Sequence, residues 1–145
     1  MPLQFGKVED PRGYPPRPSA YAVIVRDDGR ILAVVDGPET LLPGGGIDDG
    51  ESAEAAVVRE IKEETGYSSV ILSKIGDANE YILLPKQHRN VNKISAFYLA
   101  ELTGAPDPAV VPEHEPIWLL PDAFVSRTSH ESHAWAVEVA TAENQ

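Results

Sequence analysis

The sequence predicts an α/β fold, in which helices cover a β-sheet. Two observations support this class: β-branched and apolar runs fill residues 19–36 and 70–102, and helix-type periodicity fills residues 52–65 and 128–141. Strands, a helix, more strands and a last helix, in that order, are typical of a sheet covered by helices. At 145 residues the chain has room for one domain that buries roughly two-thirds of its extended-chain surface.

The composition excludes several classes of protein. It is 42% hydrophobic and 24% charged, as in ordinary globular domains, and it contains no cysteine, so disulfides, thiolate metal sites and a cysteine nucleophile are excluded. No stretch approaches the ~18 consecutive apolar residues of a membrane span, and the start lacks a signal-peptide pattern, so we expect a cytoplasmic protein. The formal net charge of −11 argues against a nucleic-acid polymer as partner. A small nucleotide remains compatible if metal ions bridge the two sets of negative charge.

The first 18 residues are rich in proline and are predicted to form an extended arm with few backbone hydrogen bonds. The arm is either a frayed terminus or part of an interface, such as that of a homodimer. Residues 19–145 are predicted to form the single domain.

The domain is expected to open with two strands, over residues 19–26 and 30–36. Asp28-Gly29 between them is typical of a hairpin turn. Residues 43–46, Pro-Gly-Gly-Gly, then form a loop whose backbone can adopt conformations closed to other residues.

The helix predicted next begins at Ser52, a good N-cap residue, and ends at Gly66. Its last two turns carry Glu60, Glu63 and Glu64 at i, i+3, i+4 spacing, on one face and beside the apolar stripe. These charges repel one another and lie at the negative end of the helix dipole, and each effect costs about a few tenths of a kcal/mol. A bound cation would offset this cost, and Mg²⁺ prefers such oxygen ligands. The alternative is a solvated acidic face.

The remaining elements are predicted from shorter patterns. The last helix is expected over residues 128–141, where Thr128 and Glu131 have the spacing of a capping box and Trp135, Val139 and Ala136 form the buried stripe. The other strands are predicted from short apolar runs, over residues 70–75, 79–84, 93–102 and 117–120.

One motif is much more specific than these patterns. Gly45 is followed after five residues by Glu51, and after seven more by residues 59–66, which read Arg-Glu-Ile-Lys-Glu-Glu-Thr-Gly. This pattern resembles the Nudix box of the nucleoside-diphosphate-linked-moiety hydrolases, with every fixed position present at its fixed spacing. Tyr67 takes the last slot, which is usually aliphatic. The resemblance implies an α/β/α sandwich, with a mixed sheet between helices and a metal site formed by the box loop and helix.

The resemblance also implies a metal site, with about one to three Mg²⁺ or Mn²⁺ ions. Glu60 and Glu64 are the expected ligands, Glu63 is a third ligand or an outer-shell group, and the Gly45 carbonyl is a further ligand. Two acids outside the box, Glu113 and Glu115, either complete the metal site or are solvated loop residues.

The residues expected to take part in catalysis are Glu51, Arg59, Glu63 and Glu64. Arg59 would pair with Glu51 and with loop carbonyls, and so orient the loop against the helix. The general base is either a box glutamate or an acid from another loop.

The implied activity is hydrolysis of a diphosphate linkage in a nucleotide or nucleoside-diphosphate derivative, by attack of a metal-activated water on phosphorus. A (deoxy)nucleoside triphosphate or an ADP-ribose-type compound is the expected substrate. Outside the box, Arg17, Tyr81, Arg89 and Lys93 are candidates for binding it. The alternatives for these four residues are a solvated hairpin tip and the sheet core. Two other functions stay open: a nucleotide sensor of the same fold without turnover, and a structural protein with a metal-stabilised helix.

Overall fold

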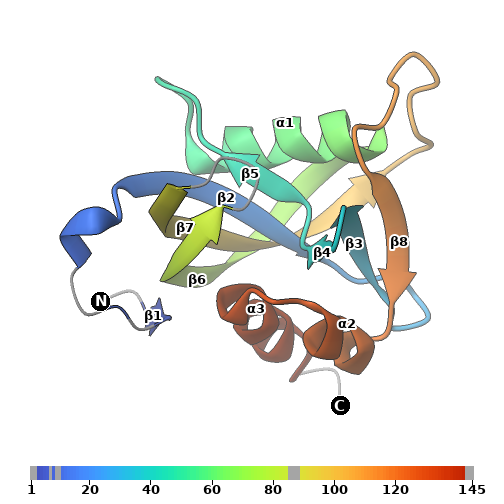
Figure 1. The fold of residues 1–145 in the computed structure, drawn as a ribbon. Coiled ribbons are helices and arrows are strands. Elements are labelled where there is room, and N and C mark those ends of the chain that lie inside the picture. The colour runs from blue at the N-terminus through green and yellow to red at the C-terminus, as the bar shows by residue number, and fades with distance from the viewer. Residues whose placement is uncertain (1–2, 7, 9–10, 85–88, 143–145) are drawn as a thin grey trace.

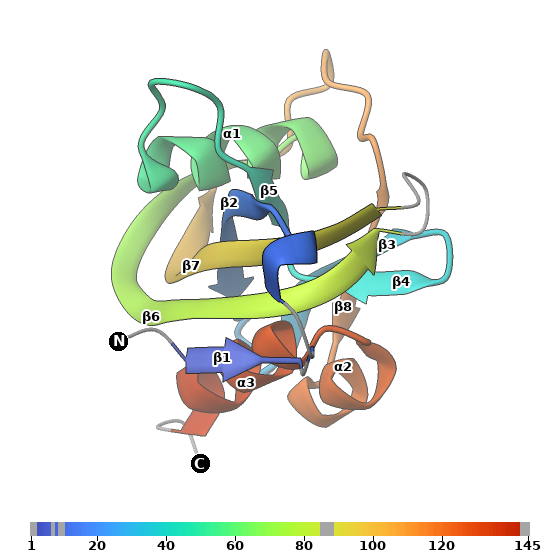
Figure 2. The ribbon, with the colours of Figure 1, turned by 60° about the vertical axis from the view of Figure 1, so that its left-hand side comes forward.

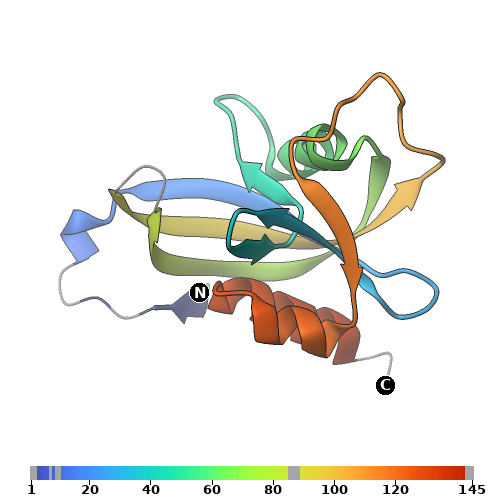
Figure 3. The ribbon, with the colours of Figure 1, turned by 45° about the vertical axis from the view of Figure 1, so that its right-hand side comes forward.

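The computed structural model describes residues 3–6, 8, 11–84 and 89–142. Helix α1 (Ala53–Thr65) covers one face of a five-stranded sheet, and helices α2 (Pro121–Arg127) and α3 (Glu131–Ala142) lie on the opposite side (Figure 1; Figure 3 shows the same layers from another side). The α/β/α sandwich predicted from the sequence is therefore confirmed. Within the described residues, no helix is long and apolar enough to span a membrane.

The five-stranded sheet is mixed. Its strands run in the order β1-β6-β7-β2-β5, and the pairs β1·β6 and β2·β7 are parallel while the others are antiparallel. Figure 2 shows the short β1 lying beside β6. The strand bounds, in spatial order, are Leu3–Phe5, Ser68–Leu84, Arg89–Thr103, Pro16–Ile24 and Gly44–Gly46.

A second, antiparallel sheet has the order β4-β3-β8, formed by Glu39–Leu41, Ile31–Asp36 and Glu115–Leu119. The hairpin predicted around Asp28-Gly29 is therefore only partly right. The tight turn exists, because Arg26 N–H donates to the Arg30 carbonyl at 2.7 Å. However, β2 and β3 then diverge into different sheets and share only the bridge Val25–Ile31.

Strand β2 shows how the two faces of the large sheet are filled. Ala20, Ala22 and Ile24 point toward α1, whereas Tyr21 and Val23 belong to the core on the α3 side. This alternation follows from the two-residue period of a strand. β2 begins at Pro16, three residues before its predicted start, and a one-turn 3₁₀ helix at Pro11–Gly13 precedes it.

Both predicted ends of α1 are confirmed. The Ser52 Oγ accepts a hydrogen bond from Ala55 N–H at 3.1 Å, and Gly66 ends the helix with a φ of 82°. Between these ends Val57 and Ile61 are fully buried against the sheet.

Two predictions about the later elements are wrong. Residues 70–84 belong to one 17-residue strand, β6, which has register shifts between Ile71 and Ser73 and between Lys74 and Gly76 but continues through the predicted break at residues 76–78. The helix predicted over residues 128–141 corresponds to α3, which starts only at Glu131, and the preceding helix α2 was not predicted.

The cap predicted for the last helix is also wrong. Thr128 closes the end of α2, and the first N–H groups of α3, those of Glu131 and Ser132, donate to the Glu80 carboxylate at 3.0 Å. Of the predicted buried stripe, Ala136 is buried and Trp135 packs partly buried against the core, whereas Val139 is 43% exposed. The buried side of α3 also carries Ser132, His133, Val137 and Thr141, so it is rotated from the predicted stripe.

Candidate active site

The glycine loop lies against both β2 and helix α1. Gly44 and Gly45 are the register partners of Tyr21 and Ala20 in the β2–β5 pair. A Cβ built on Gly45 would lie 2.8 Å from the carboxyl carbon of Glu60. Gly45 therefore lacks a side chain where a carboxylate of α1 touches the loop, which is a close approach that other residues would block.

Glu64 is the most buried carboxylate of the helix, with 4% of its surface exposed. Its Oε1 accepts a hydrogen bond from Gly44 N–H at 2.8 Å. Among the described residues, no lysine or arginine nitrogen lies within 4 Å of it, in contrast to Glu51, Glu60 and Glu63. Burial, first, and the charges of the neighbouring carboxylates raise the pKa of Glu64 to about 8, against the opposing effect of the Gly44 hydrogen bond.

Glu60 lies beside Glu64 on the same side of the loop. Burial raises the pKa of Glu60, and a hydrogen bond from Arg59 opposes that rise. Glu63 is more exposed, at 42% of its side chain, and points to Arg59. In the described part of the chain, no three Asp, Glu, His or Cys side chains gather closely enough to hold one metal ion. The structure thus brings Glu60 and Glu64 to the loop and leaves Glu63 at its margin.

Arg59 makes the contacts predicted for it. Its Nε and Nη2 donate to the two carboxylate oxygens of Glu51 at 2.8 and 2.9 Å, and Nη2 also donates to the Gly46 carbonyl at 3.1 Å. Nη1 donates to Glu60 at 3.0 Å and to Glu63 at 3.3 Å. The Arg59 hydrogen bonds, first, and one from the Asp48 N–H lower the pKa of Glu51 to about 2. One guanidinium therefore connects the loop residues Gly46 and Glu51 to the helix carboxylates of Glu60 and Glu63.

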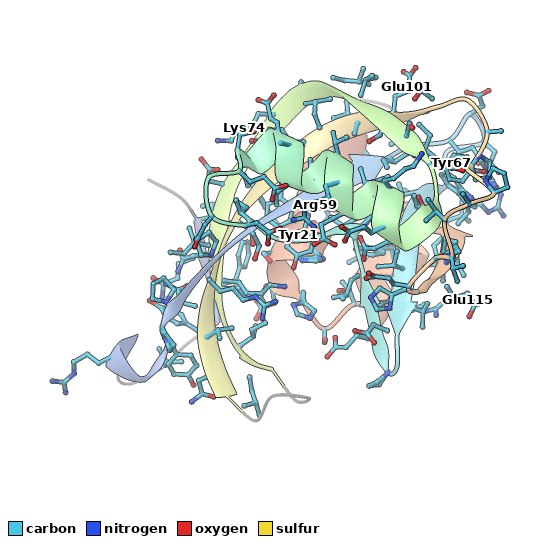
Figure 4. All side chains as sticks on the ribbon, turned by 90° about the horizontal axis from the view of Figure 1, so that it is seen from above. Tyr21, Arg59, Tyr67, Lys74, Glu101 and Glu115 are labelled. Atoms are coloured by element: carbon cyan, nitrogen blue, oxygen red, sulfur yellow. The ribbon has the colours of Figure 1, made fainter. Side chains whose placement is uncertain are left out.

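The two acids predicted from outside the box differ in position. Glu113 N–H donates to the Glu63 carbonyl at 3.3 Å, and the Glu113 charge contributes to the raised pKa of Glu60 and of Glu64. Glu115 begins β8 and is exposed, and Figure 4 shows it well away from Arg59. The structure therefore brings Glu113, and not Glu115, to the acidic end of α1.

The four predicted substrate residues do not form one group. Arg17 and Lys93 are register partners on β2 and β7. Tyr81 lies on β6, edge-on to Tyr14 with ring centroids 5.5 Å apart, and alternation puts it on the other face of the sheet from Lys93. Arg89 begins β7, but its side chain lies outside the described part of the structure.

The sequence did not predict a buried polar cluster on the α3 side of the sheet. Its members are Tyr21, Glu80, Lys93, His130 and His133, all no more than 8% exposed. The Leu42 N–H donates to His133 Nδ1 at 3.1 Å, and the Tyr21 and His133 rings lie 4.3 Å apart. The cluster therefore reaches Leu42, which lies between β4 and the glycine loop.

In comparisons with known proteins, the family model described as the NUDIX domain matches residues 15–139. Over 59 residues, 39% of this chain and 40% of the relative, the chain is 49% identical to the putative 8-oxo-dGTP diphosphatase of Bacillus subtilis (strain 168). Over 73 residues, 47% of this chain and 45% of the relative, it is 36% identical to an RNA pyrophosphohydrolase of Novosphingobium aromaticivorans. The chain thus spans less than half the length of each of these two relatives.

Solved structures agree with these matches. The crystal structure of a MutT NUDIX hydrolase from Burkholderia pseudomallei is 29% identical, with a TM-score of 0.66 over 87% of this chain and 98% of that one. A NUDIX hydrolase from Nitrosomonas europaea has a TM-score of 0.72 over 90% of this chain and 91% of that one, at 19% identity, and supports the fold alone.

Proposed function

Because the chain belongs to the NUDIX domain family, we propose that it hydrolyses a diphosphate linkage in a nucleotide or nucleoside-diphosphate derivative, with a divalent metal ion. The observation that carries this proposal is the position of Glu60 and Glu64, two partly or fully buried carboxylates that lie against Gly44 and Gly45 of one loop. Two carboxylates held together in a buried site are costly unless a cation joins them.

The donor set fits Mg²⁺ or Mn²⁺. Carboxylate and carbonyl oxygens are the ligands that these hard ions prefer, so Glu60, Glu64 and the Gly45 carbonyl would hold about one to three ions, with Glu63 a ligand or an outer-shell group. When bound, such an ion supplies positive charge that offsets the charge of the diphosphate.

The protein's own groups would then position and deprotonate water. Arg59 and Glu51 fix the loop, so that the backbone approaches the diphosphate closely. The general base is Glu63, Glu64 or Glu113, each of which lies at the acidic end of α1. Water adds to phosphorus as the phosphoanhydride P–O bond breaks, and the base takes the water proton.

The names of the relatives widen the range of substrates. One is named for 8-oxo-dGTP and another for RNA, while a solved structure of the same fold is titled an ADP-ribose pyrophosphatase. Nucleoside triphosphates and ADP-ribose-type compounds remain the proposed classes, and the RNA match adds a triphosphate-ended RNA to the candidates despite the net charge of −11. The cytoplasmic location, the homodimer and the separate arm over residues 1–18 stay predictions.

Phosphate release by the purified protein with Mg²⁺ tests the proposal, with pyrophosphatase and phosphatase as coupling enzymes. The panel contains nucleoside triphosphates, oxidised deoxynucleotides, ADP-ribose, diadenosine polyphosphates and a short RNA with a 5′-triphosphate. Glu64→Gln is the test variant. Glu54→Gln, which changes an exposed acid in the first turn of the same helix, is the matched control.

We expect hydrolysis of at least one class, its loss in Glu64→Gln and its retention in Glu54→Gln. Hydrolysis by Glu64→Gln at the wild-type rate would refute the role of Glu64. Nucleotide binding without turnover in the wild type would favour the sensor function instead.

A further inference from the structure

Lys93 is a buried cation outside the acidic site. It lies on β7, is 8% exposed, and faces the side of the large sheet that α3 covers. Its Nζ donates a hydrogen bond to the Tyr21 hydroxyl and lies 4.6 Å from the centre of the Tyr21 ring. Burial of an ammonium group costs several kcal/mol unless other groups compensate it. The question is which group offsets this charge.

Glu80 is the nearest candidate in the sheet, because it is the cross-strand partner of Lys93. However, its carboxylate is already used at the start of α3. Its Oε1 accepts from the Ser132 N–H at 3.0 Å and from the Ser132 hydroxyl at 2.6 Å, and its Oε2 accepts from the Glu131 N–H at 3.0 Å. Within the described residues, no carboxylate oxygen lies within ion-pair distance of Lys93 Nζ. Lys93 therefore keeps donors that the fold does not use.

The two histidines of the cluster do not replace the missing partner. Burial, first, and the charge of Lys93 lower the pKa of both His130 and His133, which favours their neutral forms. His130 bonds to Glu39 at 3.1 Å, and His133 accepts from the Leu42 N–H. An ammonium has three donor protons and a phenol has one, so Lys93 and Tyr21 together can still donate to an incoming acceptor.

The position of this pair relates it to the proposed site. Tyr21 is the register partner of Gly44, whose N–H binds Glu64. Lys93 pairs with Arg17, four residues along β2 from Tyr21, which is a span of about 13 Å. On the sheet face that carries Tyr21, the intervening Ser19 is buried and Arg17 is half-buried. The pair therefore lies between the glycine loop and the half-buried Arg17.

We propose that Lys93 and Tyr21 form a subsite that recognises a keto oxygen on the nucleobase of the substrate. This inference rests on the proposed function for the identity of the ligand as a nucleotide. A keto oxygen accepts hydrogen bonds, as at position 6 of guanine, whereas adenine carries an amino donor there, which would oppose the ammonium. A phosphate fits less well, because Glu80 belongs to the cluster, Glu39 contacts its His130, and Lys93 is its one buried cation among the described residues.

The test compares two ligands that differ at that oxygen: inosine 5′-monophosphate, with a 6-keto group, and purine riboside 5′-monophosphate, without it. Equilibrium binding is measured by calorimetry on the full chain, without metal and without turnover. Wild type is compared with Lys93→Met, which keeps the length and removes the charge, and with Lys93→Gln, in case the first variant folds poorly. Lys74→Met changes an exposed lysine on β6 and is the matched control.

We expect wild type and Lys74→Met to bind the keto ligand about 10- to 100-fold more tightly than its partner. Lys93→Met should lose that ratio through weaker binding of the keto ligand alone, and should unfold at the wild-type temperature or above. Equal loss of both ligands would indicate a phosphate contact and overturn the proposal. A wild type without keto preference, or a ratio unchanged in both Lys93 variants, would overturn it as well. A keto preference that depends on Lys93, in a protein that hydrolyses nothing, would support the subsite while the proposed hydrolysis fails.

Discussion

The Gly44 N–H donates to the Glu64 carboxylate over 2.8 Å, and this bond joins the glycine loop to the end of helix α1. It partly compensates the burial of Glu64, since a hydrogen bond to a charged acceptor contributes about 1.5–3 kcal/mol. Burial still dominates, because the pKa of Glu64 is raised to about 8. The bond therefore positions the carboxylate without removing its electrostatic cost.

The first prediction concerns Glu64→Gln in the absence of metal. The folded pKa of about 8 exceeds the ordinary value of 4.5, so between these pH values the folded protein holds a proton that the unfolded chain releases. The free energy of unfolding therefore falls as the pH rises from 4.5 to 8, and the full cost is present above 8. Glutamine keeps the acceptor for Gly44 and carries no charge. We expect Glu64→Gln to be more stable than wild type by about 2–4 kcal/mol at pH 9, and nearly equal to it at pH 4.5.

Urea unfolding with a chelator, at pH 5 and pH 9, measures this difference. Glu54→Gln, on the exposed first turn of α1, should show no such dependence on pH. A Glu64→Gln protein that is less stable than wild type at pH 9 would show that the carboxylate stabilises the metal-free fold.

The second prediction compares two neighbouring glycines. A Cβ at Gly45 would lie 2.8 Å from the Glu60 carboxyl carbon, whereas a Cβ at Gly46 would have no neighbour closer than 4.0 Å. Gly45→Ala must therefore displace Glu60, and Gly46→Ala need displace nothing. We expect a fall in kcat/KM of about tenfold or more for Gly45→Ala, since small misplacements at a reacting centre are costly. Gly46→Ala should stay close to wild type in a steady-state assay. Equal rates for the two variants would remove the argument for contact between Glu60 and the loop.

Contacts between residues close together in the sequence or in one motif could be predicted from the sequence. Contacts that depend on how distant elements pack against each other could not. Ser52 and Gly66 bound α1 as predicted, because caps depend on their own backbone and on residues within one turn. The Arg59–Glu51 pair was also predictable, since the motif fixes both residues. The partnership of Glu80 with α3 joins residues 51 and 52 positions apart and depends on how that helix docks.

The short helix α2 and the contact between Lys93 and Tyr21 could not be predicted from the sequence either. α2 has only seven residues, about two turns, and is too short to give a periodic pattern. Lys93 was predicted as a substrate residue, but its contact with Tyr21 follows from the parallel pairing of β2 with β7, which no local pattern encodes.

The third prediction concerns Arg59→Lys. The guanidinium reaches Glu51 through two nitrogens and also bonds Gly46, Glu60 and Glu63. A lysine keeps the charge but cannot form the planar fork. We expect a lower melting temperature and a loss of kcat/KM of about tenfold or more, mainly in kcat.

Thermal unfolding and steady-state kinetics measure these two effects of Arg59→Lys. Arg26→Lys, whose guanidinium bonds Asp28 on the exposed turn, is the matched control and should keep its activity. If Arg59→Lys matched wild type in both assays, charge alone would suffice at this position.

The fourth prediction concerns the acid side of the stability curve. His133 is fully buried between the Tyr21 and Phe97 rings, and its Nδ1 accepts the Leu42 N–H. Burial, first, and the charges of Lys93 and His130 lower its pKa well below 6.5. Below pH 6.5 the unfolded chain therefore binds a proton that the folded chain excludes. The resulting contribution to stability is present above pH 6.5 and is lost as the pH falls, at no more than about 1.4 kcal/mol per pH unit for this one group.

Urea unfolding at pH 7.5 and pH 5.5 should show that His133→Gln loses less stability between these two pH values than wild type does, although the variant is less stable than wild type at pH 7.5. His114→Gln, in the loop before β8, removes a histidine outside the core and should lose as much as wild type. If His133→Gln lost as much as wild type, the acid sensitivity would have to come from His130 or from the carboxylates of the fold.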